Sequence, residues 1–151
     1  MNLLAIDCEM VGDINNQPIL AKVSIVNFNL EVVYDSFVRP TADVYHGRDT
    51  GFSATQLLNG KSFQQVQDDV LNLIKGNTLI GHSLDADLRA LRISHNNKRD
   101  VATFEVSSNG ERRSLKDLAW ELLGKRIQTG RHHDSIEDAQ AAMLIYRKRP
   151  F

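Results

Sequence analysis

The chain has 151 residues, 42% hydrophobic and 25% charged, which is typical of one globular domain with an ordinary buried core. No apolar run approaches the roughly 20 residues needed to span a membrane, and the segment after Met1 does not resemble a signal peptide. The single cysteine, Cys8, excludes an internal disulfide and suits a reducing compartment. We therefore expect one intracellular domain over residues 1–151 that does not enter a membrane. The sequence does not distinguish a nuclear from a cytoplasmic location.

Charge is distributed unevenly along the chain. Residues 1–88 carry five Lys/Arg and eleven Asp/Glu, a net charge of −6, whereas residues 89–151 carry thirteen and eight, a net charge of +5. Such a division can place metal-binding carboxylates beside a surface that attracts phosphates. Solvated charges that happen to segregate explain it equally well, so charge alone does not identify the function.

Hydrophobic periodicity predicts a mixture of strands and helices. The run at 2–8 is predicted to be a strand buried on both faces, and 21–28 and 32–38 form a predicted hairpin. After it come helices at 63–74, 84–93, 115–123 and 135–147, a short strand at 78–80, and a loop at 95–113. An antiparallel start followed by alternating helices and strands predicts an α/β fold, a mixed sheet with helices packed on its faces.

Two acids close the first predicted strand. Asp7 and Glu9 are two residues apart, so both side chains project from one face of the strand while Cys8 projects from the other. Adjacent carboxylates repel near a core unless a cation joins them, and hard ions such as Mg²⁺ or Mn²⁺ prefer oxygen ligands. Two acids fraying from a strand end would give the same letters, so this pair alone does not establish a metal site.

A second acidic segment follows the strand at 78–80. Ser83 is the predicted N-cap of the helix that begins at Leu84. Asp87 falls on the stripe that faces the core, where an acid requires a cation or a strong hydrogen-bond partner. Asp85 points away and is explained as a first-turn acid that favours the helix dipole. We therefore predict Asp87 to be the functional residue.

The third segment opens the last predicted helix. Asp134 and Glu137 match a capping box, which places His133 just outside the helix and Asp138 just inside it. The alanines that follow would let this helix approach the sheet closely and bring Asp138 toward the acids of the strand. A lone histidine such as His133 is more often an exposed loop residue. Because His132 and His133 are adjacent, they should point in different directions.

Together these residues resemble the DEDDh 3′→5′ exonucleases of the ribonuclease-H-like superfamily. The similarity is greatest to the RNA-exonuclease branch that contains the interferon-stimulated exonuclease and the ribosomal-RNA-processing exonucleases. Three ordered motifs carry it, and it spans essentially the whole chain. They are 7–12 (DCEMVG), 81–82 with Asp87, and His133 with Asp138 in the run 135–139 (SIEDA); further similar stretches are 34–40 (YDSFVRP) and 50–51.

The resemblance implies a ribonuclease-H-like mixed five-stranded sheet with helices on both faces, and a single exonuclease domain. It also implies a two-metal hydrolysis with Mg²⁺ or Mn²⁺ that releases nucleoside 5′-monophosphates. Asp7 would bridge both ions, Glu9 and Asp138 would complete one site, and Asp87 would support the other. His133 would act as the general base on the attacking water.

Substrate contacts are less well marked. The resemblance implies a single-stranded RNA or DNA with a free 3′ end, RNA being favoured, and it does not identify protein partners. Met10 would pack on the terminal sugar or base and Leu57 would wedge against the base, although both also fit a core position. In the segment 45–48, His46 stands where the branch often has arginine, and Arg48 is the predicted basic contact. The alternatives are an exonuclease acting mainly on DNA and an inactive nucleic-acid-binding domain of the same fold.

Overall fold

Five strands form one mixed sheet in the order β3-β2-β1-β4-β5. The structure is a computed structural model, and residues 2–45, 50–103 and 112–151 are described. Strand β2 is antiparallel to both β1 and β3, whereas β4 runs parallel to β1 and β5 parallel to β4. The bounds are β1 Leu3–Gly12, β2 Pro18–Asn27, β3 Val32–Phe37, β4 Thr78–Gly81 and β5 Lys98–Asp100.

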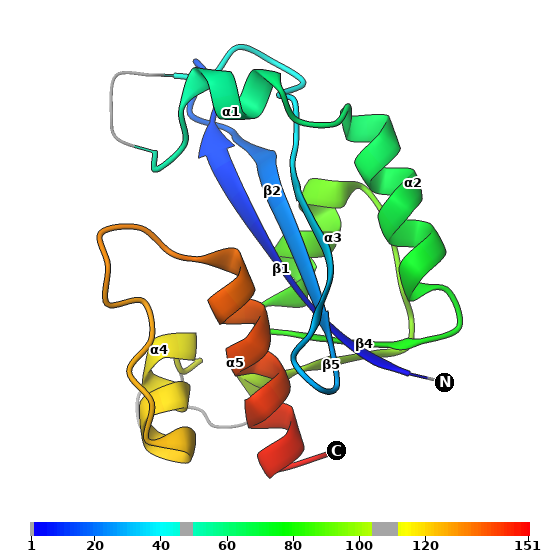
Figure 1. Cartoon of the computed structure of the whole chain (residues 1–151), viewed down its shortest axis with the longest axis vertical. Helices are drawn as coiled ribbons and strands as arrows, with labels where there is room; N and C mark the ends of the chain where they lie inside the picture. The colour runs from blue at the N-terminus through cyan, green and yellow to red at the C-terminus, as the bar shows by residue number, and fades with distance from the viewer. Residues whose placement is uncertain (1, 46–49, 104–111) are drawn as a thin grey trace.

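Helices cover both faces of this sheet, as the sequence predicts (Figure 1). On one face α2 (Phe63–Ile74) and α3 (Leu84–Leu91) pack against a cluster that includes Leu4, Ile6 and Cys8 of β1. On the other face α5 (Ser135–Lys148) packs around Ala5. With 14 residues, α5 is the longest helix described, and within the described part of the chain no helix is long and apolar enough to cross a membrane.

Strand β1 is longer than the predicted strand at 2–8. It pairs with β2 as far as Gly12, opposite Pro18, and the register shifts between Glu9 and Met10. The prediction that Asp7 and Glu9 end the strand is therefore wrong, because hydrogen bonding to β2 continues beyond them. A bulge next to two acids bends the strand and re-aims the side chains beside it.

Several short elements were not predicted from the sequence. Helix α1 (Ala54–Leu58) is a five-residue helix with a capping box at Ser53. The predicted loop at 95–113 contains β5 and the 3₁₀ turn η1 (Val101–Thr103). The predicted helix at 115–123 is present, but only its start is α-helical, as α4 (Leu115–Leu118). It continues as the π-helical segment η2 (Ala119–Leu123).

Candidate active site

Strand β1 places two acids on the face of the sheet that α5 covers. Cys8 lies in the core cluster on the opposite face, so Asp7 and Glu9 share a side, as alternation predicts. Their carboxyl groups are close enough to share a hydrogen bond. Two acids in contact at the edge of a core must share a proton or be compensated by positive charge.

Helix α3 brings Asp87 to this pair. Asp87 is only 4% exposed, whereas Asp85 points outward and lies 3.6 Å from Lys98 Nζ, so the predicted inward and outward faces are confirmed. Ser83 occupies the N-cap position of α3, as predicted, but its side chain does not cap the helix. Ser83 has a left-handed backbone (φ 63°) and makes no capping side-chain bond. Its N–H instead donates to Asp100 at the end of β5 (2.8 Å), as does the next N–H (2.9 Å), and this ties the start of α3 to the sheet.

Helix α5 supplies the fourth acid. Its N-cap is Asp134, as predicted, and the Asp134 carboxylate accepts from Ile136 N at 2.9 Å. Asp138 is 3% exposed, in the first turns of a helix whose alanines are buried against the sheet. The predicted reciprocal half of the capping box is wrong, because the Glu137 carboxylate accepts from the backbone N–H of Gln128 instead (2.9 Å).

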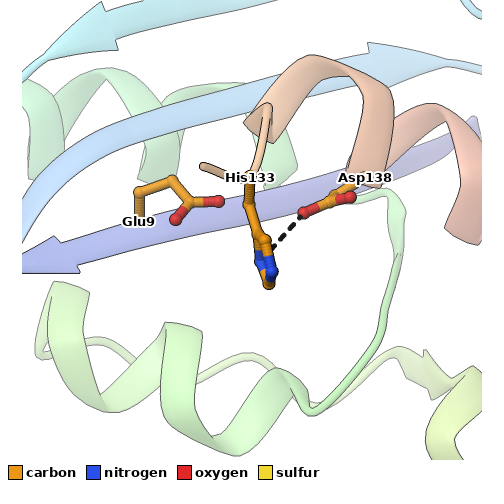
Figure 2. A group of neighbouring side chains, drawn as sticks. All are labelled: Glu9, His133 and Asp138. Carbon is orange, nitrogen blue, oxygen red and sulfur yellow. Dashed lines mark ion pairs between the residues drawn. The ribbon is translucent and has the colours of Figure 1, made fainter. Parts of the chain in front are cut away.

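His133 completes the group in front of α5. Its Nδ1 lies 3.8 Å from Asp138 Oδ2, and its side chain is 55% exposed. Figure 2 shows the His133 ring between the carboxylates of Glu9 and Asp138. One potential ligand atom from each of these three residues lies within 4.8 Å of the others. The adjacent His132 ring instead packs beside Gly51, so the two histidines point in different directions, as predicted.

Burial and the charges of neighbouring acids raise the pKa of all four carboxyls. Burial is the largest cause in each case. The charges of Asp87, Glu9 and Asp138 raise the pKa of Asp7 further. A backbone hydrogen bond from Cys8 partly opposes the rise in the pKa of Asp87. Without a cation, this cluster holds protons or bears uncompensated negative charge.

Two buried oxygen atoms test whether a divalent cation fits this cluster. Asp7 Oδ2 and Asp87 Oδ2 are buried and have no hydrogen-bond partner among the residues that the structure describes. Buried polar atoms are normally hydrogen-bonded, and two exceptions in one cluster of acids are explained by a bound water or ion. An all-carboxylate donor set with unused lone pairs is what Mg²⁺ or Mn²⁺ binds. The residues present therefore fit a divalent metal.

A glutamine that was not predicted holds the buried acid of α5. The Gln128 Nε2 atom donates to Asp138 Oδ1 at 3.1 Å and thereby counteracts the rise in the pKa of Asp138. Gln128 has a left-handed backbone (φ 57°). Its N–H is held by Glu137, so two bonds fix this loop to the start of α5. No periodic pattern in the sequence marks such a residue. That Glu137 accepts from Gln128 and not from the helix start is visible only in the structure.

A lysine on β2 was also not predicted. Lys22 is the direct cross-strand partner of Glu9, and its charge lowers the pKa of Glu9. Lys22 Nζ lies 3.5 Å from Asp35 Oδ1. That same oxygen accepts from Ser24 Oγ (2.6 Å), which lies 2.6 Å from Ser135 Oγ, so a polar chain links β3, β2 and the first residue of α5. The run at 34–40 that resembles the exonucleases contains Asp35 and was a signal for this network.

An open cavity of about 300 Å³ adjoins these residues. Glu9, Lys22 and His133 line it, together with the aromatic rings of Phe37 and Phe52. Acidic, basic and aromatic groups thus meet in a space of the size that small ligands occupy. The arrangement suits a nucleotide, whose phosphate needs charge compensation and whose base offers a flat apolar face.

Comparison with known proteins agrees with this geometry. The family model RNase_T, described as exonuclease, matches residues 4–146, nearly the whole chain. The chain belongs to this exonuclease family. Membership implies dependence on a divalent metal, in accord with the acidic cluster.

Similar proteins are RNA exonucleases and related nucleases. The chain is 46% identical to RNA exonuclease 4 of Mycosarcoma maydis over 158 residues, which covers 98% of this chain and 42% of that protein. It is 38% identical to the human apoptosis-enhancing nuclease, covering 95% of this chain and 48% of that protein. The chain therefore spans less than half the length of either relative.

Solved exonuclease modules share the ribonuclease-H-like fold. The Neurospora crassa Pan2 catalytic unit superposes with a TM-score of 0.83 at 27% identity, covering 97% of this chain and 26% of that one. The Saccharomyces cerevisiae Pan2 module in complex with A7 RNA gives a TM-score of 0.83 at 29% identity, with 97% and 28% covered. The predicted fold class, a mixed five-stranded sheet with helices on both faces, is confirmed.

The three predicted substrate contacts of this exonuclease domain lie in different surroundings. Leu57 is 2% exposed and packs in a small cluster with Val11, so it occupies the core position that was its alternative. Met10 is partly buried against the main cluster beneath β1. Arg48 falls outside the described residues, as does His46. The structure therefore brings the four acids and His133 together, whereas Leu57 lies in the core and the other two contacts stay predictions.

Proposed function

We propose that this domain is a 3′→5′ exonuclease that removes nucleoside 5′-monophosphates one at a time from single-stranded RNA. The observation that carries the proposal is the convergence of four acids and one histidine from β1, α3 and the start of α5. Family membership supports the reaction class. The names of the relatives, RNA exonuclease 4 among them, and the RNA in the Pan2 complexes support RNA over DNA as substrate.

In this proposal two Mg²⁺ or Mn²⁺ ions are held by the acids. Asp7 would contact both ions, Glu9 and Asp138 would complete one site, and Asp87 would contribute to the other. Bound ions would polarise the scissile phosphate and stabilise the attacking and leaving oxygens. The unpartnered oxygens of Asp7 and Asp87 are the atoms that most need such a ligand.

The histidine would carry the proton. His133 is exposed enough to meet water and substrate, and it stands beside the acids without an ordinary hydrogen bond to them. In its neutral form it would accept a proton from the attacking water. Asp138, 3.8 Å away, would then stabilise the resulting imidazolium. Lys22, opposite Glu9, would add positive charge where the phosphate enters.

Two other functions remain as alternatives, and the site favours neither. An inactive nucleic-acid-binding domain would not need four repelling acids, which oppose folding when no metal is bound. An exonuclease acting mainly on DNA would use the same acids. Discrimination between RNA and DNA depends on contacts to the 2′-hydroxyl. The test must therefore compare the two nucleic acids directly.

The decisive experiment is a digestion time course on matched single-stranded RNA and DNA carrying a 5′ label, with Mg²⁺ or Mn²⁺. The proposal expects a ladder that shortens by one nucleotide from the 3′ end, faster on RNA. A companion RNA with a blocked 3′ end should be spared. Internal fragments from the outset would show an endonuclease, and equal binding without cleavage would show an inactive domain. Faster digestion of DNA would overturn the preference for RNA.

A further inference from the structure

The single tryptophan of the chain is exposed on the surface of η2. Trp120 is 52% exposed, whereas its neighbours Leu118 and Ala119 are fully buried. A single exposed apolar side chain is ordinary on a protein surface, so the case for a binding site rests on what surrounds this ring. The helix itself is unusual here, because π-helical segments are rare and are frequent at functional sites.

Positive charge surrounds this ring. The guanidinium of Arg126 lies 4.6 Å from the centroid of the Trp120 ring, a cation–π contact that covers part of the ring. A cavity of about 230 Å³ opens between them and is lined also by Lys116, Asp117 and Thr129. Two cations against one anion give this lining a net positive charge. An aromatic platform with Arg and Lys beside it is what proteins use to bind single-stranded nucleic acid.

The cavity is connected to the acidic site by a short stretch of chain. Thr129, at its edge, directly follows Gln128, whose side chain bonds Asp138. The segment after η2 therefore lines the Trp120 cavity with Thr129 and contacts the acidic site through the bond from Gln128 to Asp138. Figure 1 shows α4 and the loop that follows it on the same side of the sheet as α5, with the loop leading to the start of that helix.

We propose that the Trp120 cavity is a second binding site for the single-stranded substrate, which holds a base upstream of the scissile phosphate. The base stacks on the uncovered surface of Trp120, and Arg126 or Lys116 pairs with a backbone phosphate. This inference rests on the proposed function, since it takes the substrate to be a nucleic acid. Stacking on an aromatic ring tolerates any base, so the site adds affinity and length preference without adding sequence specificity.

The tryptophan supplies its own measurement. With Trp120 the only tryptophan, its fluorescence reports this cavity directly. The Asp7→Asn variant, which should not cleave, is titrated with single-stranded RNA of two, four and eight nucleotides. We expect saturable quenching of Trp120 fluorescence by the eight-nucleotide RNA. The dinucleotide should quench it little, because it is too short to extend from the acidic site to Trp120. An eight-nucleotide RNA with one abasic position, moved stepwise along it, should lose quenching at one upstream position.

Variants separate stacking from general effects. Trp120→Ala should weaken binding of labelled eight-nucleotide RNA by roughly five- to a hundredfold, while Trp120→Phe should retain most of it. The KM for long RNA should rise in Trp120→Ala, with kcat on a dinucleotide unchanged. Phe28→Ala is the matched control: Phe28 is 47% exposed, lies 4.7 Å from the guanidinium of Arg147, and does not line the Trp120 cavity. It should leave RNA binding unchanged.

The two proposals fail in different ways. If the wild-type domain degrades RNA but Trp120 is not quenched and Trp120→Ala binds normally, the second site is wrong and the exonuclease stands. If RNA quenches Trp120 but is never shortened, the binding site stands and the exonuclease is wrong. If Phe28→Ala weakens binding as much as Trp120→Ala, the effect belongs to the whole charged surface and the assignment to this cavity is overturned.

Discussion

The charge of Asp87 on α3 raises the pKa of Asp7 on β1. Each of these two carboxyl groups also has one buried oxygen without a hydrogen-bond partner among the described residues. Like charges held together oppose folding unless a counterion joins them. The acidic cluster therefore lowers the stability of the metal-free protein, as is common at functional sites. Removing one charge should therefore separate stability from activity.

The first prediction concerns Asp7→Asn. Without metal, this variant should melt a few degrees higher than the wild type, because about 1 kcal/mol of relieved repulsion raises Tm by roughly 3 °C in a domain of this size. Its activity on RNA should fall by about 10²-fold or more, since the two metal ions of the proposed mechanism would lose the ligand that they share. Thermal melts in EDTA and digestion of labelled RNA measure the two effects. Activity above a tenth of the wild-type rate would contradict the assignment.

The second prediction concerns pH. An acid whose pKa is raised on folding keeps its proton in the folded protein at pH values where the unfolded chain has released it. Stability therefore falls as pH rises from about 4 through the raised pKa values. The metal-free protein should lose Tm toward neutral pH, and saturating Mg²⁺ should restore most of it.

Carboxylates whose pKa is lowered on folding make stability rise with pH instead. Asp69 is one of them, and a hydrogen bond from Tyr34 is the chief cause of its lowered pKa. The comparison is therefore the difference in Tm between wild type and Asp7→Asn, measured in EDTA from pH 4 to 8. That difference should grow as pH rises. A difference that is constant or shrinks would show that Asp7 does not titrate as its burial requires.

The third prediction compares two acids on one helix. Asp87 is buried beside the acidic cluster, whereas Asp85 is exposed and pairs with Lys98. Asp87→Asn should therefore reduce the rise in Tm that Mg²⁺ or Mn²⁺ produces, and Asp85→Asn should leave that rise intact. Melting curves over a metal titration measure both. An equal loss in the two variants would mean that the effect comes from overall charge and not from ligation.

The fourth prediction tests the glutamine that orients Asp138. Gln128→Ala removes the bond to Asp138 Oδ1, so the pKa of Asp138 should rise further and metal binding should weaken by about 10- to 100-fold. More Mg²⁺ should recover activity. The matched control is Gln140→Ala, which removes another glutamine bond, from α5 to Leu30 O at 3.1 Å. If excess metal fails to rescue Gln128→Ala, its role is something other than supporting a ligand.

Local patterns predicted the elements that bear the acids. The stripe of apolar residues on α3 correctly oriented Asp87 inward, and the capping residue Asp134 correctly placed Asp138 at the start of α5. These positions follow from periodicities of two and 3.6 residues, which a sequence displays directly. Each of the three motifs is weak alone, and the resemblance to the exonuclease family depended on finding all three in the right order.

Contacts between distant segments were not predictable in the same way. The cap of α3 comes from Asp100, sixteen residues beyond Leu84, and Gln128 meets Asp138 only because a left-handed residue turns its loop back. The extension of β1 depends on pairing with β2, which overrides the local pattern at Val11 and Gly12. The role of Lys22 likewise depends on strand register, which fixes its position opposite Glu9.

The last prediction separates catalysis from binding at His133. Because the acids already offer oxygen ligands, which Mg²⁺ prefers to imidazole, His133 is assigned as the base. His133→Ala should lower kcat by roughly 10²–10⁴-fold, with little change in metal or substrate affinity. The wild-type rate should rise with pH, because only neutral imidazole accepts a proton from the attacking water.

That rising limb should shift or vanish in His133→Ala and persist in His132→Ala, whose ring packs beside Gly51 and not beside the acids. Rates measured at saturating Mg²⁺ from pH 5 to 9, with melting curves for each variant, make the comparison. If His133 only holds the start of α5, the substitution will lower Tm and activity together and leave the pH profile unchanged. A normal Tm with an altered profile identifies the base, whereas an unaltered profile with weakened metal binding would make His133 a ligand instead.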